Sequence, residues 1–279
     1  MATQTTLRYD PSAAYEVTSR DVEYQPGLMA RIYMPKGEGP FPAMIAVHGG
    51  AWQGKEWLQN EPSHQALAEG GLVVAAIQFR TSMDAPHPAA QEDINYATRW
   101  LKAHASDFNA SPDKMGGVGW SSGGHQIMLA AMKPHDFATI PLEGDPGVNG
   151  HLKYVIMGWP VIDPLARYRL AESKGNTDLM ARHIAYFGSV EGQEQASPPH
   201  MLKRGEHVDT PPALLLQGAA DESLPRMMSE EFVELYSLAG GVIEVGKYPG
   251  EPHGFMRNET ENTTLAFALA KSFIERHLR

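Results

Sequence analysis

The sequence has 279 residues, of which 42% are hydrophobic and 20% are charged, and its formal net charge is −10. This balance is typical of a folded globular chain and excludes intrinsic disorder. The sequence contains no cysteine, which excludes disulfides and thiolate metal sites. The acidic charge, without a dense run of Lys and Arg, disfavours a nucleic-acid partner.

A single domain spanning residues 1–279 is expected, because a chain of this length can bury roughly three quarters of the surface that it exposes when unfolded. The first ten residues lack the basic start and the apolar run of a signal peptide. No stretch of about 18 apolar residues occurs, so we expect no membrane span. These features favour a cytoplasmic protein, and they leave open whether it forms a homo-oligomer.

Short apolar runs alternate with longer segments of helical period, which is typical of a mostly parallel sheet with helices on both faces. The first two runs flank a turn at residues 25–27 and predict an antiparallel hairpin at the sheet edge. The later runs predict central strands and one last strand. The expected strands cover residues 17–24, 28–34, 43–48, 72–79, 114–120, 154–159, 213–217 and 241–245.

Two helices are predicted from apolar residues that recur every three or four positions. The first covers residues 88–105 and places Ile94, Ala97 and Leu101 on one face. The second ends the chain, and its predicted buried stripe consists of Leu265, Ala268, Leu269 and Phe273.

Residues 163–209 are too long for a simple connection between a strand and a helix, and they contain helix signals of their own. Asp163 precedes Pro164, a pattern typical of an N-cap followed by proline at the first helical position. Thr177 is a candidate cap for a second helix that Gly188 would end. We interpret this segment as a small lid over an active site; a surface excursion that touches no substrate is the alternative.

The pentapeptide Gly119-Trp120-Ser121-Ser122-Gly123 follows an expected strand and precedes an expected helix. In this context the G-x-S-x-G pattern indicates a sharp turn that presents Ser121 as a nucleophile, and only very small residues fit two positions away. Ser122 is the lesser candidate, because its register relative to the two glycines is wrong. The alternative is a glycine-rich loop without a chemical role.

Residues His48-Gly49-Gly50-Ala51-Trp52 close the expected strand at 43–48 and resemble the HGGG-type motif of lipases and esterases. The expected oxyanion hole consists of backbone N–H groups of Gly50, Ala51 and Ser122. His48 is interpreted as a structural residue rather than a base, and the alternative for the glycine pair is a simple turn.

A serine nucleophile needs a histidine base, and the histidine needs a carboxylate to orient it. Asp221 follows the expected strand at 213–217, and His253 lies in a loop before the last helix, so both occur in the required order after Ser121. Asp163 and Glu222 are the rival acids. His125 is expected to pack inside, and the remaining histidines show no metal-ligand spacing, so neither a metal nor an organic cofactor is expected.

With these motifs assembled, the chain resembles the esterase and lipase branch of the α/β-hydrolase superfamily, especially small enzymes similar to acetyl esterases, feruloyl esterases and arylformamidases. Two positions depart from the hormone-sensitive-lipase group: Ser122 replaces an alanine and Ala51 replaces the third glycine. The resemblance extends from about Asp21 onward and includes residues 48–52, 79–80, 93–101, 112–114, 119–123, 217–221 and 253–255.

The resemblance implies an α/β-hydrolase fold and hydrolysis of a carboxylic ester of a small molecule through an acyl-enzyme on Ser121. An amidase of the arylformamidase type would use the same residues. A non-catalytic binding protein on the same fold is the alternative from another class, and it is disfavoured because His253 is present. An aromatic-walled substrate pocket is expected, although each of its residues could instead fill the core: Trp52, Trp120, Trp159, Tyr186 and Phe255.

Overall fold

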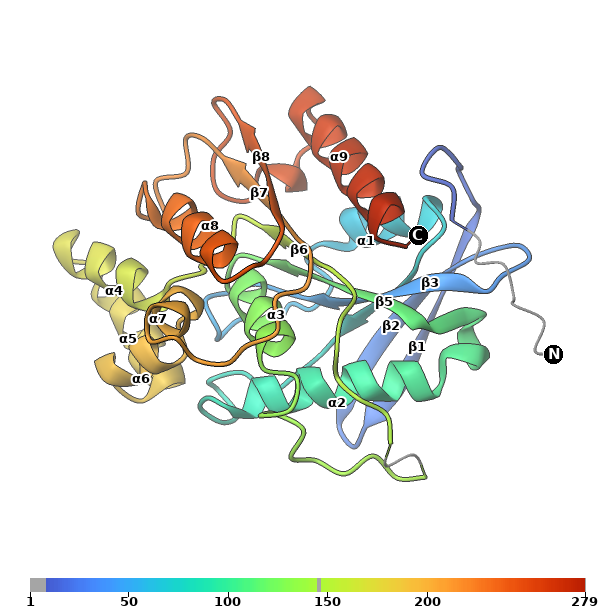
Figure 1. Cartoon of the computed structure of the whole chain (residues 1–279), viewed down its shortest axis with the longest axis horizontal. Coiled ribbons are helices and arrows are strands. Elements are labelled where there is room, and N and C mark those ends of the chain that lie inside the picture. The colour runs from blue at the N-terminus through green and yellow to red at the C-terminus, as the bar shows by residue number, and fades with distance from the viewer. Residues whose placement is uncertain (1–8, 145–146, 279) are drawn as a thin grey trace.

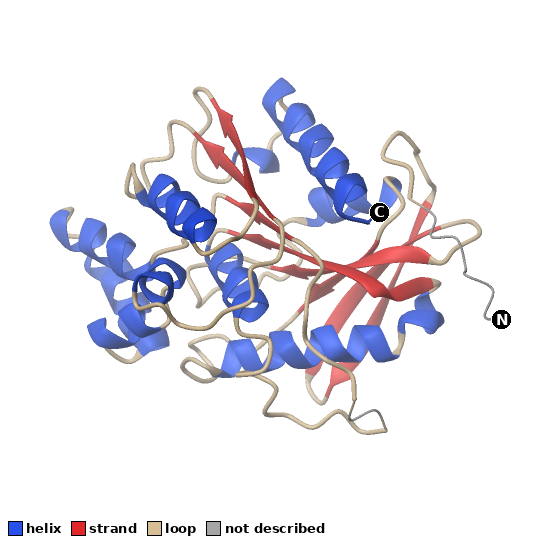
Figure 2. Ribbon diagram, in the orientation of Figure 1, coloured by secondary structure: helices blue, strands red, loops and turns tan. Residues whose placement is uncertain are grey.

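A computed structural model describes residues 9–144 and 147–278 and shows one eight-stranded sheet with helices on both faces (Figures 1 and 2). The strands lie in the order β1-β2-β4-β3-β5-β6-β7-β8. Their bounds are β1 Val17–Gln25, β2 Leu28–Pro35, β3 Phe41–Val47, β4 Val73–Ile77, β5 Ala110–Trp120, β6 Val155–Gly158, β7 Ala213–Gly218 and β8 Ile243–Tyr248.

Strands β1 and β2 form the expected antiparallel hairpin, and β1 is an edge strand. Strand β2 is also antiparallel to β4, whereas the pairs from β4 through β8 are parallel. The central strands β3, β4, β6 and β7 are buried throughout, as expected for strands covered on both faces. The predicted α/β-hydrolase architecture is therefore confirmed.

Two apolar cores lie on opposite faces of the sheet. Residues of α2, α3 and α8 pack into one core, and residues of α1 and α9 pack into the other. No helix in the two described ranges is long and apolar enough to cross a membrane. The helices are α1 Glu61–Glu69, α2 Ala89–Ala103, α3 Ser122–Met132, α4 Pro164–Ser173, α5 Thr177–Phe187, α6 Val190–Gln195, α7 Pro198–Lys203, α8 Met228–Leu238 and α9 Glu261–Leu278, with short 3-10 helices at Ala105–Phe108 and Phe255–Arg257.

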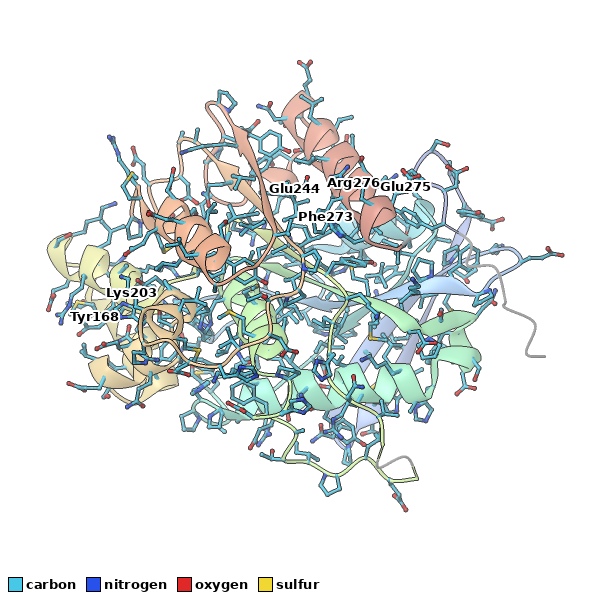
Figure 3. The ribbon with its side chains drawn as sticks, in the orientation of Figure 1. Tyr168, Lys203, Glu244, Phe273, Glu275 and Arg276 are labelled. Atoms are coloured by element: carbon cyan, nitrogen blue, oxygen red, sulfur yellow. The ribbon has the colours of Figure 1, made fainter. Side chains whose placement is uncertain are left out.

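The predicted buried stripe of α9 is right for Phe273 and wrong for Leu265 and Ala268, which are exposed. Leu269 is partly buried against the core, and the buried side chains beside Phe273 are Ala266, Ala270 and Ile274. Small alanines let the helix approach the sheet closely, so Leu265 turns outward despite its apolar character. Figure 3 labels Phe273 and, beside it, the surface pair of Arg276 with Glu244 of β8, joined at 2.7 Å.

Residues 163–209 contain four short helices, α4 to α7, between β6 and β7 (Figure 1). Asp163 caps α4 as predicted, because its carboxylate accepts a hydrogen bond from the N–H of Ala166 at 3.1 Å. The cap of α5 is Asn176 rather than Thr177, and Gly188 follows the last residue of that helix. Tyr168 on α4 and Lys203 on α7 are labelled in this region in Figure 3.

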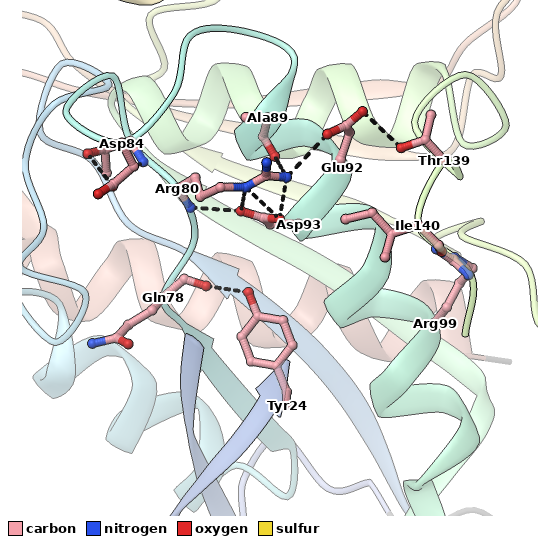
Figure 4. Close-up of polar contacts among 11 residues, drawn as sticks. Tyr24, Gln78, Arg80, Asp84, Ala89, Glu92, Asp93, Arg99, Thr139 and Ile140 are labelled. Carbon is pink, nitrogen blue, oxygen red and sulfur yellow. Dashed lines mark hydrogen bonds and ion pairs between the residues drawn. The ribbon is translucent and has the colours of Figure 1, made fainter. Parts of the chain in front are cut away.

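An ion pair with a buried carboxylate fixes the loop that follows β4. Asp93 on α2 has a fully buried side chain, and Arg80 donates to both of its oxygens, at 2.8 Å from Nη2 and 2.9 Å from Nε (Figure 4). The backbone N–H of Arg80 also donates to Asp93 at 2.8 Å. Two residues further on, the N–H of Ser82 donates to the carbonyl of Trp52 at 2.9 Å. The pair therefore anchors a loop that in turn holds the loop after β3.

Replacing Arg80 with Met should lower the free energy of unfolding by about 2–3 kcal/mol, because Asp93 would stay buried without its cation. This loss of unfolding free energy is smaller than for a fully buried pair because Arg80 is one-third exposed. The matched control is Arg276→Met, which breaks an exposed pair and should cost at most about 1 kcal/mol. Urea denaturation measures both, and equal losses in the two variants would contradict the anchoring role of Arg80.

Candidate active site

The turn between β5 and α3 holds Ser121 in a conformation that non-glycine residues rarely adopt, with φ 55° and ψ −119°. A Cβ added to Gly119 would lie 2.2 Å from the carbonyl oxygen of Gly123. One added to Gly123 would lie 2.3 Å from the carbonyl oxygen of Val47 and 2.4 Å from that of His48. Both positions of the motif therefore exclude any side chain, as the sequence predicted.

Hydrogen bonds with the β6 region hold the backbone of Ser121 in this conformation. Its N–H donates to the carbonyl of Gly158 at 2.9 Å, and its own carbonyl accepts from Val161 at 3.0 Å. The α3 helix begins directly afterwards, and its first-turn N–H groups from Gly124 and His125 also point at this carbonyl. These contacts supply the surrounding structure that a strained residue requires.

The loops after β7 and β8 bring Asp221 and His253 to the turn. The Nε2 atom of His253 lies 2.9 Å from the hydroxyl of Ser121, and its Nδ1 atom lies 2.7 Å from Oδ2 of Asp221. With an ionised Asp221, Nδ1 carries the proton and donates it, so Nε2 is left to accept from the serine hydroxyl. The side chain of Asp221 is 2% exposed, whereas that of His253 is 20% exposed.

Asp221 has two further hydrogen-bond donors. Gln217 donates from its side-chain amide to Oδ2 at 2.9 Å, and the N–H of Ser223 donates to Oδ1 at 2.8 Å. Burial of the carboxyl group opposes ionisation, but the hydrogen bond and charge of His253, together with these two donors, hold the pKa of Asp221 below its ordinary value. Sequence reasoning gave Gln217 no role, although its place at the end of β7, four residues before the acid, was a usable signal.

The rival residues have other partners. Asp163 caps α4 and accepts from Ser197 at 3.1 Å, and the backbone carbonyl of Glu222 accepts from Lys174 at 2.8 Å. His125 is fully buried and contacts the carbonyl of Ala196 through Nε2 at 2.8 Å. His48 is buried and contacts the carbonyl of Gly49 through Nδ1, as a structural histidine would.

The loop after β3 lies against the serine turn. A Cβ on Gly49 would come within 2.8 Å of the carbonyl oxygen of Trp120 and 3.2 Å of Cβ of Ser121. Gly50, Ala51 and Trp52 all have positive φ angles, of 114°, 51° and 59°. The N–H of Trp52 donates to Oγ of Ser122 at 3.3 Å, which ties the loop to the first residue of α3.

The three N–H groups predicted to bind an oxyanion belong to this pair of loops. Across the described chain, those of Gly50, Ala51 and Ser122 have no hydrogen-bond acceptor. Ala51 occupies the left-handed region that favours glycine, which explains why a glycine is usual there and why alanine, with the smallest side chain, replaces it. The geometry leaves these three donors free for a ligand.

The structure places all five aromatic side chains predicted for the substrate pocket in the interior, each at most 2% exposed: Trp52, Trp120, Trp159, Tyr186 and Phe255. Trp52 packs beneath α5, stacked on Tyr186 with ring centroids 5.8 Å apart, and Trp120 stacks on Trp159 at 5.2 Å. This differs from the expected aromatic wall, because stacking on one another removes these rings from the cavity surface. Their contact with a substrate stays a prediction.

Two cavities adjoin the site instead; the wall of the larger one mixes apolar and polar side chains, and that of the smaller one is mainly polar. One, of about 1120 Å³, opens between the loop at Asp221 and helix α8. The other, of about 410 Å³, lies between α4, α5 and the loop after β3. We call this second one the α4–α5 cavity; it is lined by Ala51, Arg167, Leu170, Ala171, Lys174, Asn176, Asp178, Leu179, Arg182, Glu222 and Ser223. Nowhere in residues 9–144 and 147–278 do three or more His, Cys, Asp or Glu gather so that they could hold a metal ion.

The sequence matches the family model BD-FAE over residues 31–236, which is most of the chain. The chain belongs to the BD-FAE family. Two curated proteins of Mycobacterium tuberculosis are similar to it. The carboxylic ester hydrolase LipN is 32% identical over 88% of this chain and 66% of its own length, and the probable carboxylic ester hydrolase LipM is 28% identical over 78% of this chain and 50% of its own length. The chain thus spans between half and two thirds of these relatives.

Solved structures of an esterase are similar to the chain along almost its whole length. The apo form of Thermogutta terrifontis esterase 2 superposes with a TM-score of 0.73 at 26% identity and covers 97% of both chains. The form of that esterase phosphonylated by sarin superposes with a TM-score of 0.74 at 25% identity, covering 97% of this chain and 98% of its own. The predicted resemblance to the esterase and lipase branch of the α/β-hydrolases is therefore confirmed.

Replacing Gly123 with Ala should destabilise the protein by at least about 2–3 kcal/mol, because the new Cβ would collide with two backbone carbonyls that cannot move aside. Thermal unfolding measures the effect. The control is Gly147→Ala, where a Cβ would meet open space and the φ angle is ordinary. Similar melting temperatures for the Gly123 variant and the wild type would contradict the close approach of α3 to β3.

Burial lowers the pKa of six histidines from about 6.5. The pKa falls to about 4 for His48, His87 and His183 and to about 3 for His64 and His125, and it is also lowered for His277. Because the folded state holds these rings neutral, the unfolded chain binds more protons below pH 6.5. Stability should therefore be full above that pH and fall from pH 6.5 to 5, by roughly 1.4 kcal/mol per pH unit for each excess proton.

Urea denaturation at several pH values measures this slope. His64 offers the matched variant, because its Nδ1 is buried without a hydrogen-bond partner and its ring packs beside Tyr33. In His64→Phe the slope should shrink by about one proton. A stability that stays flat from pH 6.5 to 5 would show that the buried histidines do not control it.

Proposed function

We propose that this protein is a carboxylic ester hydrolase that acts through an acyl-enzyme on Ser121, with His253 as base and Asp221 as the acid that orients it. The observation that carries the proposal is the unbroken chain of two hydrogen bonds from the Ser121 hydroxyl through both ring nitrogens of His253 to Asp221, at 2.9 and 2.7 Å. This arrangement lets the ring accept the hydroxyl proton while the carboxylate stabilises the resulting imidazolium.

In the proposed reaction, Oγ of Ser121 attacks the ester carbonyl carbon and its proton passes to Nε2 of His253. The tetrahedral oxyanion accepts hydrogen bonds from the N–H groups of Gly50, Ala51 and Ser122. Collapse of this intermediate breaks the ester bond, and His253 returns the proton to the departing alcohol. Water then attacks the acyl-enzyme with His253 again as base, which releases the carboxylic acid and restores Ser121.

In this proposal residues 163–209 act as a lid. The support is that α5 lies directly over the oxyanion loop, where the ring of Trp52 packs against His183 at 4.7 Å and Phe187 at 4.9 Å. Since Trp52 adjoins two of the proposed oxyanion donors, the position of α5 bears on their geometry.

Ser121→Ala should lower kcat/KM for p-nitrophenyl butyrate by four orders of magnitude or more, and Asp221→Asn by roughly 10³–10⁴-fold, because each removes one member of a unit that moves the proton. Ser237→Ala, an exposed serine on α8, is the control and should keep wild-type activity. Release of p-nitrophenolate measures all three. Wild-type activity in Ser121→Ala would refute the nucleophile, and p-nitroanilides tested in parallel compare esters with amides.

A further inference from the structure

The α4–α5 cavity adjoins the proposed catalytic groups. Its wall includes Ala51 of the oxyanion loop, and it also includes Ser223, whose N–H binds Asp221. A substrate whose carbonyl occupied the proposed oxyanion site would therefore extend one of its ends into this cavity. The chemistry of the wall then bears on which esters are accepted.

The cavity wall includes a buried guanidinium group. Arg167 on α4 is 8% exposed, and its Nε and Nη1 atoms are shielded from solvent without a hydrogen-bond acceptor among residues 9–144 and 147–278. Arg80 and Arg31 differ from Arg167 because each forms an ion pair with a carboxylate. Arg80 binds Asp93, and Arg31 binds Asp21. Burial of unpaired cationic groups is costly, so an unsatisfied guanidinium beside an active site requires an explanation.

The charge of Arg167 persists at neutral pH. Burial lowers its pKa to about 10, and the negative charge of Asp221 limits that fall while the nearby Arg182 adds to it. A pKa of this size still leaves the group cationic at pH 7. Arg167 thus presents a positive charge in a setting where water screens it weakly.

The other charged groups of the cavity do not neutralise Arg167. Arg182 and Lys174 add positive charge, and Lys174 donates to a backbone carbonyl, that of Glu222, at 2.8 Å. Two acids, Asp178 and Glu222, also line the cavity, but within the described chain neither forms an ion pair with either arginine. The cavity therefore holds an excess of cationic groups in a protein whose net charge is −10.

A purely electrostatic role toward Asp221 would leave the donors of Arg167 unexplained. That carboxylate already accepts from His253, Gln217 and Ser223, and Arg167 makes no hydrogen bond to it. The charge of Arg167 is thus not neutralised by a hydrogen bond to the catalytic acid. Since Nε and Nη1 are shielded from solvent, an anion in the cavity would approach the guanidinium through the part of Arg167 that lines the cavity, and it would supply the missing countercharge.

From these contacts we propose that the enzyme's substrates are esters that carry a carboxylate, and that Arg167, assisted by Arg182, binds this carboxylate in the α4–α5 cavity. The inference rests on the proposed function, since it names the class of ester that the same site hydrolyses. The carboxylate can belong to the acyl half or to the alcohol half of the ester, and both give the same recognition chemistry.

Two matched substrate pairs distinguish these sources. For the acyl half, p-nitrophenyl hydrogen glutarate is compared with p-nitrophenyl methyl glutarate. For the alcohol half, 4-acetoxybenzoate is compared with its methyl ester. The wild type should prefer the acid in at least one pair, and Arg167→Met should lower kcat/KM for that acid by roughly ten- to a hundredfold, mainly through KM, while its neutral partner changes less than about threefold.

Arg167→Lys keeps the charge without the planar group and should recover part of the preference. A role that acts only through Asp221 would instead reduce both members of a pair equally and shift the pH profile of kcat. The inference is overturned if Arg167→Met lowers kcat/KM equally for the acid and its neutral partner, or if the wild type prefers the acid in neither pair.

Binding without turnover separates this inference from the proposed function. Titration calorimetry on the Ser121→Ala protein compares monomethyl glutarate with dimethyl glutarate, and methyl 4-acetoxybenzoate with its free acid. If the acid binds more tightly than its neutral partner, and adding Arg167→Met to the Ser121→Ala protein removes this difference, the anion site is supported. This holds even if the wild type hydrolyses no ester, and in that case only the proposed function fails. Equal binding of acid and neutral ester in both pairs refutes the anion site.

Discussion

The site depends on one steric constraint, which is the contact between the turn that carries Ser121 and the end of β3. The Cα of Gly123 approaches the carbonyls of Val47 and His48 so closely that no Cβ fits between them, and Gly49 approaches the carbonyl of Trp120 in the same way. Because these are contacts between backbones, they leave little freedom in the relative position of the two loops. The candidate nucleophile and the candidate oxyanion donors therefore share one rigid frame.

Parallel strands supply the rest of the site. Strands β3, β5, β7 and β8 all end at the same edge of the sheet, so the loops after them converge although they are up to about two hundred residues apart in sequence. Asp221 and His253 come from the last two of these loops. The pair of Arg80 with the buried Asp93 acts at the same edge, since it fixes the loop that binds the carbonyl of Trp52.

Charge is distributed unevenly around this frame. Asp221 is surrounded by donors that keep it ionised, while the helices between β6 and β7 bring Arg167 and Arg182 to the neighbouring cavity. Burial holds His183 of α5 and His125 of α3 neutral, so Trp52 packs against uncharged rings. The candidate site thus places Asp221, whose pKa is held low, beside a cavity that has an excess of cationic groups.

Local chemistry along the sequence determined the edge hairpin, the alternation that gives a parallel sheet, the turn at Ser121 and the order of the candidate acid and base. These follow from side-chain period and from glycines at fixed spacing, which act over a few residues. Only the tertiary structure decided that Asp221 rather than Asp163 meets His253, that Gln217 supports the acid, and that Arg167 is buried without a partner. The same holds for the large aromatic rings, which turned inward, and for α9, which packs through alanines. Burial and pairing depend on which distant segments come into contact, and residue type and spacing in one chain do not specify those contacts.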